Sequence, residues 1–108
     1  MAYRLAVSEQ AELQIDSLLR YLLFNLGSRT AAGHLLDSLE DIYARLKDEP
    51  FQFPLCRDIY LEARGYRKAI ITGMDYIVIF SIVGEDVHIH GVYHQSEDFE
   101  DKLQIYDR

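Results

Sequence analysis

The sequence predicts an α+β fold in which two helices cover one face of a mostly antiparallel sheet. An alternating apolar segment comes first, two segments with apolar residues at helical spacing follow, and three strand-like segments fill the C-terminal half. The 108 residues include 18 acidic and 11 basic side chains, a formal charge of −7, and 49% are hydrophobic. This is an ordinary globular composition, so we expect one domain over residues 1–108.

The N-terminal half is expected to contain a strand and then a helix. Apolar residues alternate over residues 3–7, which indicates a short strand, and Ser8 can cap the helix that follows it. Apolar residues then recur every three or four positions over residues 11–26, so this helix should be amphipathic. Gly27 is expected to end it.

A second amphipathic helix should follow almost at once. Ser28 can cap it, its apolar stripe runs from Ala32 to Leu46, and Pro50 ends it. Only one or two residues connect the two helices, so they should fold back as an antiparallel hairpin.

The C-terminal half should form a three-stranded antiparallel meander over residues 66–72, 75–83 and 87–94. The preceding stretch, residues 49–64, has no clean period and is long for a loop, so we expect part of it to be functional or to pair with a sheet edge. Residues 96–106 suggest a short acidic helix or an ordered tail. Because both helices go to one face, the other face of the sheet should be open.

Particular residues accompany this order of elements. They are Glu49-Pro50 after the second helix, Gly65-Tyr66-Arg67-Lys68 before the second strand, Asp75-Tyr76-Ile77-Val78-Ile79-Phe80 in the third, Val87, Ile89, Val92, Tyr93 and His94 in the fourth, and Asp98 and Leu103 in the tail. In this order and spacing they resemble the RelE/ParE superfamily of bacterial type II toxins, which includes plasmid stabilisation proteins. The resemblance spans essentially the whole chain. It implies a growth-inhibiting toxin that a cognate antitoxin neutralises by wrapping across the sheet and helices. Its target would be ribosome-bound mRNA, as in RelE-like members, or DNA gyrase, as in ParE-like members.

The ribonuclease alternative needs titratable groups on one face of the fold. A metal-free ribonuclease must deprotonate a 2′-hydroxyl, stabilise charge on a phosphate and protonate the leaving oxygen. The catalytic candidates are Arg67, His94 and Tyr93, and Arg64 and Lys68 add positive charge nearby. In members resembling YoeB the fourth strand ends in a Tyr-His-Tyr run, and the resemblance aligns Tyr93 and His94 with its first two residues.

Two departures weaken that alternative. Ribonuclease members carry an arginine at the start of the third strand, where this chain has Tyr76, as on the ParE side. The net charge of −7 also differs from the basic character of ribosome-dependent toxins. The ParE pattern is itself incomplete, because the basic run that often follows the fourth strand is replaced by Gln95-Ser96-Glu97-Asp98. Three alternatives therefore stay open: inhibition of gyrase or another target, mRNA cleavage, or a non-toxic interaction module with an eroded site.

Contacts with a target or an antitoxin are expected from Arg64, Lys68, Tyr76 and Asp98. His88 and His90 form an H-x-H pair that could supply two metal ligands. Alternation would put His94 on the same face and Tyr93 on the opposite one, and a polar strand face explains this pattern without a metal. We therefore expect no metal and no cofactor.

The remaining composition bears on location and partners. Cys56 is the single cysteine, so no internal disulfide can form, which favours a reducing compartment. We expect its small side chain to be partly buried. No secretory signal or membrane span is recognisable, so we expect a cytoplasmic protein. The acidic balance argues against sequence-independent nucleic-acid binding, and we expect no sequence-specific DNA binding by the chain alone. The dense apolar run of Leu22, Leu23, Phe24 and Leu26 suggests that a partner covers part of it.

Overall fold

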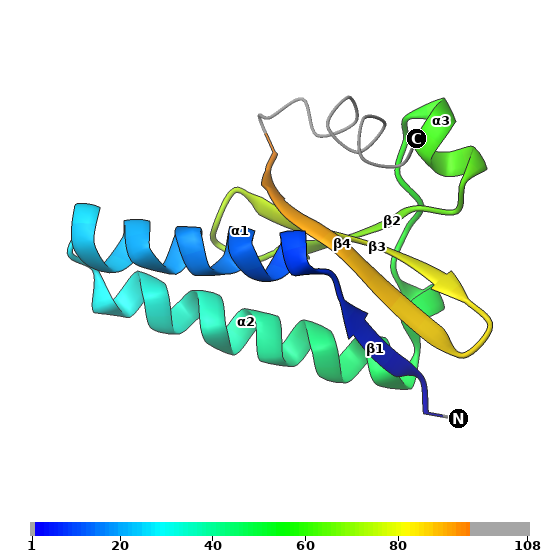
Figure 1. The fold of residues 1–108 in the computed structure, drawn as a ribbon, viewed down its shortest axis with the longest axis horizontal. Helices are drawn as coiled ribbons and strands as arrows, with labels where there is room; N and C mark the ends of the chain where they lie inside the picture. The colour runs from blue at the N-terminus through cyan, green and yellow to red at the C-terminus, as the bar shows by residue number, and fades with distance from the viewer. Residues whose placement is uncertain (1, 96–108) are drawn as a thin grey trace.

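The structure is a computed structural model that describes residues 2–95 (Figure 1). Its helices and strands follow the predicted order, with one short helix in addition that was not predicted within residues 49–64. They are β1 (Arg4–Val7), α1 (Glu9–Arg20), a π-helical turn (Tyr21–Asn25), α2 (Arg29–Asp48), a 3₁₀ turn (Pro50–Gln52), α3 (Ile59–Ala63), β2 (Arg67–Ile71), β3 (Tyr76–Val83) and β4 (Asp86–His94). The α+β class, the helix hairpin and the antiparallel meander are confirmed. The tail predicted over residues 96–106 lies outside the described residues.

The four strands form one sheet in the order β1-β4-β3-β2. β2, β3 and β4 are antiparallel neighbours, whereas β1 pairs in parallel with the first half of β4. Figure 1 shows α1 and α2 side by side as a hairpin, with α3 apart from them near the start of β2. We call the sheet face that packs against α1 and α2 the helix face, and the opposite one the far face.

Two serines begin the helices as predicted. The Ser8 hydroxyl oxygen accepts a hydrogen bond from the Ala11 amide at 3.0 Å, and the Ser28 oxygen accepts one from the Ala31 amide at 3.1 Å. Each bond satisfies one of the amides that the first turn of a helix leaves without a partner. Local sequence therefore determines where both helices start.

The end of the first helix differs from the expectation of one regular helix up to Gly27. The last turn widens to a π-helix, in which the Leu26 amide donates to the Tyr21 carbonyl at 3.0 Å. Gly27 then adopts a φ of 62° and stops the helix as predicted. The widened turn leaves Phe24 79% exposed at the tip of the hairpin.

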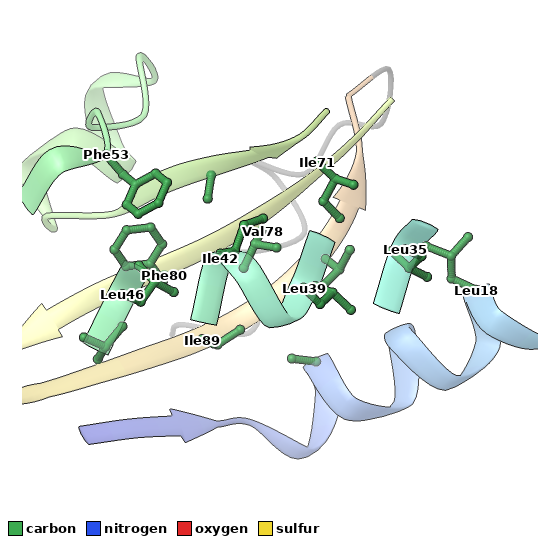
Figure 2. Packing of buried hydrophobic residues seen from close by; sticks show 14 of the residues in the cluster. Leu18, Leu35, Leu39, Ile42, Leu46, Phe53, Ile71, Val78, Phe80 and Ile89 are labelled. Carbon is green, nitrogen blue, oxygen red and sulfur yellow. The ribbon is translucent and has the colours of Figure 1, made fainter. Parts of the chain in front are cut away.

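The main core lies between the helix hairpin and the helix face of the sheet. Figure 2 shows α2 directing one stripe of side chains toward the strands. At the end nearest the 3₁₀ turn, the rings of Phe53 and Phe80 meet edge to face with centroids 5.7 Å apart. The buried members of α2 are Ala32, Leu35, Leu39, Ile42 and Leu46. These are positions of the predicted apolar stripe, so the helix packs as its periodicity indicated.

The far face is not open as predicted, because residues 49–64 pack against part of it. Cys56, Leu61 and Tyr66 form a second buried cluster with Ile77 and Ile79 of β3. β3 is apolar on both faces and therefore needs cover on both. Cys56 was expected to be partly buried, and it is buried more deeply than that, at 2% exposure. The expected pairing of this stretch with a sheet edge is limited to an isolated bridge from Leu55 to Arg67. Within residues 2–95, no helix combines the length and the apolar character needed to cross a bilayer.

Candidate functional site

A β-bulge in β4 decides where the candidate residues lie. Ile79 of β3 is opposite Gly91, whereas the next residue, Phe80, is opposite Ile89. β4 therefore holds one residue more than β3 at this point, and His90 is the extra one. Every side chain of β4 beyond the bulge therefore lies on the face opposite to the one that strict alternation along the strand would give it.

The predicted alternation of the histidines and Tyr93 is wrong for this reason. Tyr93 belongs to the buried cluster on the far face, beside Ile77. His94 lies on the helix face, where its ring meets the ring of Tyr76 edge to face with centroids 5.1 Å apart. Tyr93 and His94 thus point to opposite sides of the sheet.

β1 pairs with β4 only as far as Ile89, so the part of β4 beyond the bulge has no strand on that side. There it contacts helix α1. Gln14 Oε1 accepts a hydrogen bond from the Val92 amide at 2.9 Å. A Cβ atom at Gly91 would lie 2.7 Å from that oxygen and 2.6 Å from Cε2 of Tyr93, so only glycine fits without a shift. Gln10 Nε2 donates to the Tyr93 hydroxyl at 3.1 Å. Residue Tyr93 is 1% exposed, and the hydrogen bond from Gln10 orients its hydroxyl toward α1.

Arg67 is half-buried at the start of β2 and holds residues 49–64 against the sheet. Its Nη1 donates to the Phe53 carbonyl at 2.6 Å, and its guanidinium carbon lies 5.1 Å from the centroid of the Phe51 ring. A charge-assisted bond of this kind is stronger than a neutral one. Arg67 thus has a structural role whatever else it does.

Arg67 and His94 share the helix face but lie far apart on it. Arg67 is opposite Phe80 of β3, and His94 is opposite Tyr76, four residues away along the same strand. That separation is about 13 Å along the strand, and the two residues also lie on opposite sides of β3, about 10 Å across. The structure does not bring Arg67, Tyr93 and His94 together.

Of the other predicted contact residues, Tyr76 lies on the helix face, whereas Arg64 and Lys68 lie on α3 and the far face. Arg64 ends α3, and its guanidinium carbon lies 4.6 Å above the ring centroid of Tyr60. Lys68 is opposite Ile79, so its side chain points to the far face. Asp98 lies outside the described residues.

A cleft of about 610 Å³ lies between α1 and the end of the sheet where β3 begins and β4 finishes. It joins apolar surface to amide, hydroxyl and phenol groups, a mixture that suits protein contacts. Its lining residues are Gln10, Leu13, Gln14, Ser17, Leu18, Tyr21, Tyr76 and Val92. Of these, only Tyr76 was predicted. The polar residues at helical spacing on α1, Gln10, Gln14 and Ser17, are the signal that sequence reasoning missed.

The three groups whose pKa departs from its ordinary value lie away from this cleft. At the β1–β4 end of the sheet, a hydrogen bond of 2.8 Å from Arg4 lowers the pKa of the Asp86 carboxyl and raises the pKa of the Arg4 guanidinium. Burial raises the pKa of the Tyr43 hydroxyl on α2, and the charge of Glu12 adds to the effect. Among residues 2–95, no three His, Cys, Asp or Glu side chains gather as a metal site would require.

Comparison with known proteins bears on this arrangement. A family profile described as "ParE toxin of type II toxin-antitoxin system" matches residues 5–99. The fold is similar to a solved chain of the chromosomal ParDE toxin–antitoxin system from P. aeruginosa, with a TM-score of 0.68, 14% identity, and coverage of 86% of this chain and 96% of that one. A conserved hypothetical protein from Helicobacter pylori gives a TM-score of 0.50, 13% identity, and coverage of 88% and 97%. No curated protein sequence matches.

Proposed function

Since the chain belongs to the ParE toxin family and is a toxin of a type II toxin–antitoxin system, we propose that it arrests growth by inhibiting DNA gyrase and not by cleaving mRNA. We propose further that a cognate antitoxin neutralises it. The dispersal of the acid–base candidates is the observation that carries the choice of target.

Ribonuclease chemistry requires its acid, its base and its phosphate-stabilising group within hydrogen-bond reach of one reacting centre. Here the Tyr93 hydroxyl is buried on the far face and already bonded to Gln10. Arg67 is bonded to a backbone carbonyl, and His94 lies more than a strand width away from it. These separations leave no common position for a scissile phosphate, which supports inhibition by binding.

A tyrosine stands at the start of β3, and it lines the cleft beside α1. Tyr76 and the neighbouring ring of His94 offer aromatic surface that is half-buried, a kind of surface enriched at protein interfaces. We therefore assign Tyr76 and His94 to contact with a protein partner, and we retain Arg64, Lys68 and Asp98 as further contact candidates.

The proposal is tested by expressing the chain alone from a tightly regulated promoter. We expect growth arrest with a DNA-damage response and intact mRNA, and relief by the product of the adjacent reading frame. The purified chain should inhibit supercoiling by gyrase and leave a reporter mRNA uncut on purified ribosomes.

Variants at Arg67 and His94 separate the alternatives. If the chain were a ribonuclease, R67A and H94A would each abolish ribosome-dependent cleavage, whereas R20A, at an exposed arginine of α1, would not. Cleavage of mRNA within reading frames by the unaltered chain would overturn the gyrase proposal. A chain that is harmless at high expression would favour the eroded interaction module.

A further inference from the structure

The tip of the helix hairpin carries apolar side chains that the core of the protein hardly uses. Figure 1 shows this tip at the end of the hairpin that extends past the strands. In the π-helical turn Leu22 is buried, whereas four apolar side chains in and just after the turn are exposed. We call these four the tip patch; they are Tyr21, Leu23, Phe24 and Leu26. Exposed apolar patches mark surfaces that bind other molecules, and π-helical turns are frequent at functional sites.

The tip is basic, whereas the protein as a whole is acidic. Residues 17–36 include no Asp or Glu, although the whole chain has 18 of them, and they include two arginines. Arg20 Nε lies 3.1 Å from Asp16 Oδ2. Arg29, at the start of α2, is exposed and forms no ion pair within residues 2–95. The charge beside the tip patch is therefore positive and unpaired.

An apolar patch with positive charge beside it specifies the chemistry of its partner. Phe24 is the most exposed of the four side chains, and an aromatic ring that projects in this way binds best in a pocket that encloses it. Acidic side chains around such a pocket would attract Arg29. We propose that the hairpin tip inserts into an apolar pocket rimmed by acidic side chains on the protein that this toxin inhibits. The inference rests on the proposed function and adds which part of the toxin contacts the target and by what chemistry.

The tip patch is continuous with the cleft beside α1. Tyr21 belongs to the π-helical turn and also lines the cleft. The cleft is lined as well by Tyr76, which we assign to contact with a protein partner. Four side chains alone would make a small interface, because stable interfaces usually bury about 800 Å² on each partner. The cleft extends the surface that a partner held at the tip can cover.

The same residues disfavour two other occupants. Two copies of the chain joined tip to tip would bring Arg20 and Arg29 of one copy near those of the other, and like charges facing one another oppose association. Stable binding to a lipid bilayer takes a larger apolar face or a cluster of basic residues. The tip has a single arginine outside an ion pair within residues 2–95. A pocket on a protein fits both its size and its charge.

The first test replaces Phe24 in the full chain. F24S removes the ring and F24Y keeps it, while V83S changes an exposed apolar residue at the other end of β3. We expect F24S to weaken the inhibition of gyrase supercoiling about tenfold or more, since truncation of an aromatic anchor commonly has an effect of this size. F24Y and V83S should inhibit as the unaltered chain does. A thermal melt of each variant checks that it is folded.

The second test concerns the charge beside the tip patch. The affinity of the chain for immobilised gyrase is measured at low and at high salt. R29E should weaken binding at low salt, and this loss should shrink at high salt because ions screen the charges. K47E reverses an exposed charge at the opposite end of the same helix and should bind as the unaltered chain does. The loss caused by F24S should persist at both salt concentrations, since burial of an apolar ring does not depend on charge.

The outcomes distinguish this inference from the proposed function. Equal inhibition of gyrase by F24S and the unaltered chain would overturn the inference and leave the proposed function standing. Self-association of the free chain, or its binding to phosphatidylglycerol vesicles, would also overturn the inference if F24S abolished it. So would a fully toxic F24S that the antitoxin no longer neutralises. Growth arrest without inhibition of gyrase would count against the proposed target, and loss of that arrest in F24S but not in V83S would still support the tip as the target contact. A chain that neither arrests growth nor binds gyrase would overturn both.

Discussion

Replacing Gly91 by alanine should destabilise the protein by about 2–4 kcal/mol. The new Cβ atom would lie 2.6 Å from Cε2 of Tyr93 and 2.7 Å from Oε1 of Gln14, and real Cβ atoms essentially never come so close. Tyr93 is buried and cannot move aside freely, and overpacking of this kind costs about 1–3 kcal/mol. Gln14 would have to leave the Val92 amide, which costs about 1 kcal/mol more.

Urea denaturation of G91A, followed by circular dichroism, measures this loss as a change in the free energy of unfolding. G33A is the matched control, because Gly33 lies inside α2 with nothing within 4 Å of its added Cβ. Alanine favours helix more than glycine does, so G33A should stabilise the protein by about 0.5–1 kcal/mol. If G91A instead unfolds within about 0.5 kcal/mol of the unaltered chain, the contacts that we assign to the bulge are incorrect.

Three further predictions concern pH and the hairpin tip. Because Arg4 lowers the pKa of Asp86, the stability from this pair should be present above the ordinary pKa of 3.8 and be lost as the pH falls through the lower folded-state pKa. D86N should remove that part of the acid loss in denaturation series, and an identical acid profile would contradict the pairing. Burial and the charge of Glu12 raise the pKa of Tyr43 above its ordinary value of 10.0, so the free energy of unfolding should fall as the pH rises beyond that value. Y43F should lessen this fall. If the pH profiles of Y43F and the unaltered chain are the same, the assignment is refuted. F24S should change the free energy of unfolding by less than about 0.5 kcal/mol, since Phe24 is already 79% exposed, and a larger loss in urea denaturation would show that the tip is packed in solution.

The position of Arg67 affects how its variants are interpreted. R67A removes the hydrogen bond to the Phe53 carbonyl and the contact with the Phe51 ring, so residues 49–64 lose an anchor to the sheet. A loss of toxicity in R67A therefore has to be compared with its stability before it is assigned to a target contact. H94A needs the same comparison, because His94 is also half-buried and its ring contacts the ring of Tyr76.

Much of the fold could be predicted because it depends on neighbours in the sequence. Ser8 and Ser28 cap the helices through bonds that span three residues, and Gly27 ends the first helix by its own backbone conformation. The apolar stripe of α2 packs against the sheet, as its helical spacing predicted. Local patterns were insufficient for residues 49–64, whose short helix α3 depends on packing against the apolar far face of β3.

The candidate site was predicted less well than the fold. The residues Arg67, Tyr93 and His94 are present in the expected strands, but their directions depend on the bulge at His90, which no local pattern signals. Gln10 and Gln14 were missed because polar residues on a helix surface usually only face solvent. Their contacts with Tyr93 and Val92 bridge 83 and 78 residues of chain.

The sequence by itself determined the α+β class, the two capped helices, the meander of three strands and the toxin family, since periodicity, capping and motif order are local or linear properties. Only the tertiary structure decided which face of the sheet each residue of β4 occupies beyond the bulge. It also decided that residues 49–64 cover part of the far face of the sheet. The physical reason is that one extra residue in a strand inverts every later side chain. Gln14 of α1, far away in the chain, accepts a hydrogen bond from Val92, two residues beyond that extra residue.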